Sequence, residues 1–171
     1  MNNFIKNKHL KVMVCYGSQN GYAESLAKDI YNLLPFINTK ISSLNDVNIH
    51  EMNSYDVIIF ILSTNKLGTF PDNSKSFVTK VILKEHYFNF KYFVIGIGDS
   101  SYDEFCLPAK KLDKYLSKTN SIKLFKNIYL DDSIDHDDEY INYRNNIINI
   151  LKEEELKIKK WFTESMNNNI T

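Results

Sequence analysis

The sequence has little arginine, glycine, proline or cysteine, and it has no excess of charge of either sign. Among 171 residues, 21 Lys+Arg balance 21 Asp+Glu, and Arg144 is the only arginine. A chain without basic excess has no electrostatic footprint for nucleic acid or for a membrane surface. No apolar run approaches the roughly 20 residues of a membrane span, and residues 1–10 lack the apolar core of a signal peptide. These absences predict a soluble, cytoplasmic protein with no nucleic-acid partner and no membrane segment.

Cysteine is almost absent, which limits both disulfide and metal chemistry. Cys15 and Cys106 are the only two, and neither stands in CxxC or CxxH spacing. We expect two reduced thiols, and we expect no metal site because the four histidines also lack ligand spacing. No nucleophile–base constellation is visible either. Any redox chemistry would therefore belong to a bound cofactor.

The residues that are present predict an α/β domain. Hydrophobic residues make up 43% of the chain and aromatic residues 13%, which is enough for one packed core. Short apolar runs alternate with helical patterns, as in a parallel sheet covered by helices on both faces. The five expected strands are residues 12–16, 39–44, 55–62, 92–97 and an edge-like 122–130. The fold class is therefore a five-stranded, doubly wound parallel sheet.

The helix ends carry their own signals. Asp72 and Asn73 supply capping side chains for the helix after the third strand, and Pro108 suits a first helical turn. The last helix is expected over about residues 139–162. The predicted organisation is a lead-in over residues 1–10, one domain over 11–162, and a polar tail or linker over 163–171.

Three loops follow the expected strands and are unusual enough to carry function. The first loop, residues 17–21, is Gly-Ser-Gln-Asn-Gly between a strand and a helix. Small residues let backbone amides approach a phosphate, and the helix N-terminus adds positive potential. The loop lacks both the lysine of a triphosphatase loop and the GxGxxG order of a dinucleotide site. A single terminal phosphate fits it best, although a plain strand-to-helix turn would show the same residues.

The second loop is residues 63–72, and the third loop is residues 96–106. Open parallel sheets bind ligands outside the carboxyl ends of their strands, where both loops are expected. Tyr102 in the third loop is placed to stack on a flat apolar ring, although local packing is the alternative.

Together the three loops resemble those of the diflavin reductases. Residues 16–24, Tyr-Gly-Ser-Gln-Asn-Gly-Tyr-Ala-Glu, are similar to their flavodoxin-type phosphate loop. Residues 96–105 and 109–113 are similar to their aromatic flavin-stacking loop and the helix after it. The resemblance spans about residues 11–162 and is greatest to the cytosolic iron–sulfur assembly reductase. Three other subfamilies show a similar resemblance: the microsomal cytochrome reductases, the reductase halves of nitric-oxide synthase, and the flavodoxin domains of tRNA-wyosine enzymes.

The resemblance implies a flavodoxin-like fold with one FMN and gives each site residue a role. The phosphate would be held by Ser18, Gln19, Asn20, Gly21, Tyr22 and Ala23. The flavin would lie between Ser63, Thr64, Asn65 and Lys66 on one side and Ile97, Gly98, Asp99 and Tyr102 on the other. Phe105 and Cys106 would close the third loop, and Asp132 in the acidic segment would lie near the ring.

Three positions depart from the family pattern. Asn20 and Tyr22 stand where hydroxyl residues are usual, and Asn65 stands where many relatives place a second aromatic ring. Lys66 replaces a glycine whose carbonyl, in the family, turns toward the reduced flavin. Lysine tolerates positive φ poorly, so we expect Lys66 to hinder that turn of the backbone.

The predicted function is relay of single electrons from an NADPH- and FAD-containing reductase module to an iron–sulfur or haem protein. Nothing in the chain resembles the FAD or nicotinamide domains, so FAD and NADPH would belong to a separate domain or partner. Two alternatives stay open. One is a stand-alone FMN quinone reductase, and the other is an interaction module that has lost its flavin.

Overall fold

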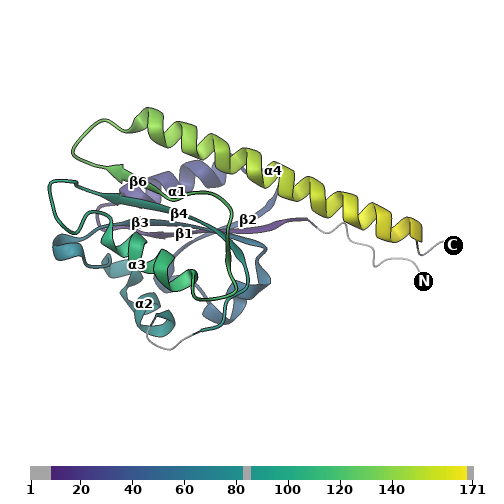
Figure 1. Cartoon of the computed structure of the whole chain (residues 1–171), viewed down its shortest axis with the longest axis horizontal. Coiled ribbons are helices and arrows are strands. Elements are labelled where there is room, and N and C mark those ends of the chain that lie inside the picture. Colours follow the sequence, from purple (N-terminus) through teal and green to yellow (C-terminus); the bar gives the residue numbers. More distant parts are fainter. Residues whose placement is uncertain (1–8, 83–85, 169–171) are drawn as a thin grey trace.

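The protein is built on one parallel sheet between two helical layers (Figure 1). The structure, a computed structural model, describes residues 9–82 and 86–168. In chain order its elements are β1 (Lys11–Gly17), α1 (Tyr22–Asn32), β2 (Asn38–Ser43), η1 (Leu44–Asp46), η2 (Ile49–Ser54), β3 (Val57–Ser63), η3 (Lys66–Gly68), η4 (Asp72–Ser74), α2 (Lys75–Val81), β4 (Lys91–Gly98), α3 (Leu107–Leu116), β5 (Ile122–Lys123), β6 (Ile128–Asp131) and α4 (Asp137–Asn168).

The strands run in the order β2-β1-β3-β4, and both β5 and β6 pair with β4. Every pairing is parallel, as in the expected doubly wound sheet. The chain passes from β1 outward to β2 and then returns to place β3 on the other side of β1. In such sheets ligands bind beside this reversal, at the carboxyl ends of the strands, here those of β1 and β3.

Side chains along each strand point alternately to the two faces of the sheet and contribute to two separate hydrophobic cores. Side chains such as Val12, Val14 and Ile59 meet α1 and α4 on one face. Their neighbours Met13, Ile58 and Phe60 pack on the opposite face, which α2 and α3 cover (Figure 1). Because both faces are buried, β3 and β4 read as nearly continuous apolar runs. The same continuity made them visible in the sequence.

The fifth strand differs from the expectation of one strand over residues 122–130. Lys123 pairs with Tyr92 and Ile128 pairs with Ile95, so four intervening residues of the edge chain lie beside two of β4. The two extra residues interrupt the ladder, as in a larger bulge. The broken segment turns Phe125 against Tyr143 of α4, with the ring centroids 5.6 Å apart.

The N-terminus of α2 also corrects a prediction. The helix is not capped by Asp72 or Asn73, because both side chains face the first loop instead. The amides of Ser76 and Phe77 are satisfied by Asn45 Oδ1, at 3.0 and 3.2 Å. A cap from a distant loop leaves no local sequence signature.

The last helix is longer than expected. It runs over Asp137–Asn168, where the sequence predicted about residues 139–162 and then a polar tail. Acidic residues fill its first turn, which the helix dipole favours. Within the residues that the structure describes, no helix combines the length and apolar character needed to cross a bilayer.

Candidate functional site

Four loops meet at the carboxyl edge of the sheet. They are the first loop after β1, the second after β3, the third after β4, and a fourth loop, residues 131–136, after β6. Because the strands are parallel and adjacent, the three loops chosen from sequence lie at the same edge. They lie around the switch point between β1 and β3.

The first loop leaves polar groups without partners at the start of α1. Gly21 adopts φ 86°, with nothing within 4 Å of the position where a side chain would begin. The first bond into the helix runs from the Ser25 amide to the Gly21 carbonyl at 2.9 Å, and no side chain caps this end. The earlier amides therefore have no partner within the helix. The Ser18 hydroxyl is buried beside them, also without a hydrogen-bond partner.

Side chains of the second loop and of Asn73, the residue after it, hold the first loop in place. Asn73 Oδ1 accepts a bond from the Ser18 amide at 2.8 Å, and Ser63 Oγ accepts one from the Gln19 amide at 3.3 Å. The Gln19 side chain bonds Asp72 through both its amide atoms, at 3.2 and 3.4 Å. The Gln19 side chain is thus used to fix the loop, whereas its predicted role was phosphate binding.

Positive φ occurs in the second loop directly after Lys66, at Leu67 and Gly68. Lys66 does not have positive φ, whereas Leu67 has φ 57° and ψ 30°. Asn65 turns its Oδ1 inward to accept the Lys66 amide at 2.8 Å. Thr64 Oγ1 donates to the Ile97 carbonyl at 2.8 Å and so joins this loop to β4.

The third loop packs closely under its neighbours. A side chain at Gly98 would begin 2.9 Å from the Cys106 amide and 3.1 Å from Thr64 Oγ1, so only glycine fits there. Cys106 is fully buried and free, with φ 53°, and burial raises the pKa of its thiol to about 12. Cys15 of β1 is likewise buried and unpaired. Tyr102, in contrast, is 66% exposed at the rim.

The fourth loop is organised by Asp131 more than by Asp132. One oxygen of Asp131 accepts the amides of Ser100 and Ser133, both at 3.0 Å. Hydrogen bonds from these two serines hold the pKa of Asp131 well below its usual range. The amide of Asp132 donates to the Gly98 carbonyl at 2.7 Å, beside the third loop. Burial, together with adjoining carboxylates, raises the pKa of Asp132, an effect that His136 opposes.

Tyr22 and His136 link the first loop to the fourth. The Tyr22 hydroxyl lies 2.7 Å from His136 Nε2. His136 Nδ1 faces the carbonyls of Asp131 and Ile134 at 3.0 and 3.1 Å, so it carries the proton and Nε2 accepts. The side chain of Tyr22 is therefore directed to the fourth loop. Sequence spacing alone treated His136 as a surface histidine.

The structure brings all predicted site residues to this edge, although their side chains divide into two groups. Gln19, Tyr22, Thr64, Asn65 and Cys106 are engaged within the protein, whereas Asn20, Lys66 and Tyr102 are exposed. Ala23 and Ile97 are buried in the elements beside the loops, and Phe105 is half-buried under the Lys110 ammonium. Sequence analysis missed Asn73, Asp131 and His136, because their partners lie far along the chain.

The first loop fits a terminal phosphate. A buried hydroxyl and uncapped helix amides converge there, and phosphate oxygens would satisfy both. The remaining three loops frame one continuous edge beside it. A doubly wound sheet with one such phosphate position is a mononucleotide-cofactor domain.

Comparison with known proteins gives the family. The flavodoxin family profile matches residues 14–142, and the chain belongs to that family. Its β2-β1-β3-β4 order with a fifth edge position is the strand order of flavodoxins. Flavodoxin domains bind FMN, so the predicted cofactor is confirmed. Proteins of this family transfer electrons one at a time.

Curated relatives are much longer than this chain. NADPH–cytochrome P450 reductase of Saccharomyces cerevisiae is 31% identical over 172 residues, which cover 93% of this chain and 25% of that protein. NADPH-dependent diflavin oxidoreductase 1 of Emericella nidulans is 32% identical over 119 residues, covering 66% and 18%. Among solved structures, a Streptococcus pneumoniae flavodoxin superposes with a TM-score of 0.73 at 22% identity, over 84% of this chain and 99% of its own. The last likeness concerns the fold.

Proposed function

We propose that this chain binds one FMN at the four loops and relays electrons singly between an NADPH- and FAD-containing reductase module and a redox protein. The unpartnered Ser18 hydroxyl at the uncapped N-terminus of α1 is the observation that carries the binding proposal. The printed names of the relatives support the reductase module. FMN, when bound, supplies a ring that accepts and releases electrons one at a time.

The residues divide the work of binding. The hydroxyl of Ser18 and the amides of the first loop and α1 hold the phosphate. The second loop borders one side of the ring, and Gly98, Asp99 and Tyr102 of the third loop border the other. Asp132 adds negative charge beside that edge, and Phe105 and Cys106 keep the third loop in shape. The carboxylates of the fourth loop favour a basic surface on the partner.

The acceptor is proposed to be an iron–sulfur or haem protein, and the location is proposed to be the cytoplasm. Two buried, unpaired cysteines suit a reducing compartment. The alternatives of a stand-alone quinone reductase and a flavin-free module make opposite predictions for the purified protein. A quinone reductase would oxidise NADPH without a partner, and a flavin-free module would show no visible absorbance.

The test compares Ser18→Ala with Ser25→Ala. Ser25 lies in the first turns of α1, and its hydroxyl donates to the Tyr22 carbonyl. We expect Ser18→Ala to weaken FMN binding by about 1.5–3 kcal/mol, the range for a bond to a charged group. Without FMN its stability should be unchanged, because the hydroxyl has no partner to lose. Titration calorimetry and urea unfolding measure the two quantities.

Chromatography of the released cofactor identifies it. FMN near one per chain is expected, and FAD would contradict the single phosphate position. Equal FMN affinities for the two serine variants would move the phosphate away from Ser18.

A further inference from the structure

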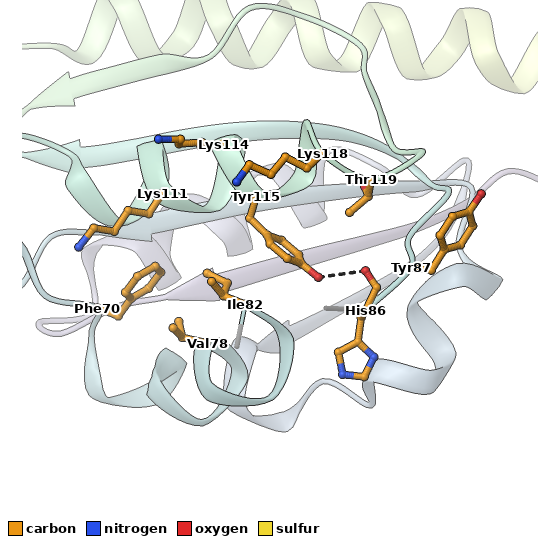
Figure 2. A pocket seen from close by; sticks show the side chains of 10 residues that line it. All are labelled: Phe70, Val78, Ile82, His86, Tyr87, Lys111, Lys114, Tyr115, Lys118 and Thr119. Atoms are coloured by element: carbon orange, nitrogen blue, oxygen red, sulfur yellow. Dashed lines mark hydrogen bonds between the residues drawn. The ribbon is translucent and has the colours of Figure 1, made fainter. Parts of the chain in front are cut away.

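A second surface, remote from the phosphate position, has the features of a docking groove. A groove of about 730 Å³ lies between α2 and α3, on the sheet face opposite α1 and α4 (Figure 2). It begins at Phe70 of the second loop and extends along α3 to His86 and Thr119. The proposed function uses neither helix face.

The floor of the groove is apolar and firmly held. Val78 and Ile82 from α2 and its end face Tyr115 of α3, and all three are half-buried. Ile82 and Tyr115 pack against the core of this sheet face. The Tyr115 hydroxyl donates to the His86 carbonyl at 3.0 Å, which fixes the ring across the groove (Figure 2). Such a floor binds apolar side chains by removing them from water.

One rim of the groove is a row of lysines. Lys111, Lys114 and Lys118 follow each other at three- and four-residue spacing on the α3 side (Figure 2). Along a helix this spacing covers about 10 Å. All three are exposed, and none forms an ion pair with another of the residues that the structure describes.

The nearby carboxylate does not neutralise this row. Asp113 of α3 accepts the Tyr92 hydroxyl at 3.0 Å and pairs with Lys123 at 2.8 Å, on the side of β4 and β5. Lys110 of α3 does not belong to this row, because its ammonium donates to the Phe105 carbonyl at 2.6 Å. Among the described residues that line the groove, three are lysines and none is acidic, so this part of the surface is locally cationic.

We propose that this groove docks an acidic amphipathic segment of a partner protein. Apolar side chains of that segment would cover the floor, and its carboxylates would face the three ammoniums. A small anion would meet only one or two charges of a row this long, and a nucleic-acid backbone offers no apolar side chains to the floor. The acidic third and fourth loops would repel the same segment, so charge directs it to α3 and leaves the loop edge open.

The probe is a fluorescein-labelled amphipathic peptide of leucine and glutamate, titrated by polarisation against the full chain loaded with FMN. Saturable binding is expected at about 0.05 M salt, with clear weakening at about 0.5 M as the charges are screened. The triple variant Lys111→Glu, Lys114→Glu, Lys118→Glu should bind about tenfold or more weakly, as loss of three exposed charge pairs predicts.

The matched control reverses three exposed lysines elsewhere, Lys40→Glu, Lys152→Glu and Lys160→Glu, and should change the affinity less than about threefold. Val78→Ser tests the floor and should also weaken binding while the lysine row remains. Amide chemical shifts should move in α2 and α3. The flavin absorbance of each sample separates this test from the FMN proposal.

Three results of the binding titrations would overturn the docking proposal. They are absence of saturable peptide binding, equal affinity of the two triple variants, and tighter binding of a single-stranded oligonucleotide than of the peptide. Shifts confined to the third and fourth loops would also overturn it.

Discussion

Leu67 has a backbone conformation that its side chain does not favour. Its φ of 57° lies in the left-handed region, and the side chain is 87% exposed, so packing does not compensate. The conformation is held by hydrogen bonds on either side. Thr69 Oγ1 donates to the Lys66 carbonyl at 2.9 Å, and the Gly68 amide donates to the Asn65 carbonyl at 3.1 Å. Strain of this kind is stored where surrounding contacts over-determine a loop.

Glycine at position 67 should therefore stabilise the protein. A left-handed L-residue costs about 1–2 kcal/mol, while glycine loses about 0.5–1 kcal/mol more backbone entropy on folding. We expect Leu67→Gly to raise the free energy of unfolding by about 0.5–1 kcal/mol in urea titrations. The control is Lys66→Gly, which has no left-handed strain to relieve and should lower it. If Lys66→Gly raised the free energy of unfolding and Leu67→Gly left it unchanged, the strain would lie at Lys66 and not at Leu67.

The connection between α1 and the fourth loop is an element-scale feature. Tyr22 sits in the first turn of α1, and His136 ends the loop that leads into α4. Their hydrogen bond joins the two helices of one sheet face close to the proposed phosphate position. Burial, reinforced by nearby carboxylates, raises the pKa of Tyr22, so its hydroxyl stays a donor at neutral pH.

A double-mutant cycle measures this connection. Tyr22→Phe and His136→Ala should each destabilise the protein, and together by less than their sum. We expect a coupling energy of about 0.5–1.5 kcal/mol, the net value of one hydrogen bond. His50→Ala, combined with Tyr22→Phe, should show additive effects because His50 lies beside His86 instead. Additivity in both cycles would mean that the bond does not contribute to stability.

The elements that the sequence predicts well are those whose burial is uniform. Residues 57–62 and 92–97 are buried on both faces, so their apolar runs were sufficient. The sequence predicted one continuous edge strand over residues 122–130, whereas the structure divides it into β5 and β6. The interruption was missed because an irregular segment can be as apolar as a strand. Leu124 and Phe125 pack against a core without lying in a ladder strand. The cap that Asn45 provides for α2 was not predicted, because the amides that donate to it lie more than 30 residues away in the sequence.

The site shows the same limit. Glycine and hydroxyl residues after strands nominated the first three loops, because a parallel sheet must bring those ends together. What the side chains do there depends on tertiary contacts. Asn73 contacts Ser18 across 55 positions, and Tyr22 contacts His136 across 114. Local pattern assigns Asn73 to a helix cap and His136 to solvent, and only the packed structure assigns them to the loops.

At the scale of the whole molecule, α4 is tied to the opposite edge of the sheet by two buried glutamates. Glu155 accepts the Leu10 amide at 2.7 Å and pairs with His9 and Lys159 at 2.8 and 3.1 Å. Glu154 pairs with Lys91, at the start of β4, and with Lys157. These contacts lie at the amino ends of the strands, so α4 is anchored at one edge while its first turn borders the proposed cofactor position at the other.

The anchor makes folding stability depend on acidity. Burial alone would raise the pKa of Glu155, but hydrogen bonds from Leu10, His9 and Lys159 outweigh it and leave the pKa lowered. A lowered pKa means that the folded chain takes up this proton less readily than the unfolded chain. The contribution of Glu155 is therefore present above the unfolded value of about 4.3 and is lost as pH falls through the folded value.

We expect the free energy of unfolding to decline as pH falls from about 6 to about 3, measured by urea titration at each pH. Glu155→Gln should lower stability at pH 7 by about 1–3 kcal/mol, because its buried donors lose a charged acceptor. It should also flatten the acid decline, since one linked proton is gone. Glu153→Gln, an exposed neighbour on the same helix, should change neither quantity appreciably. An acid decline equally steep in Glu155→Gln and the unmodified protein would show that the anchor titrates elsewhere.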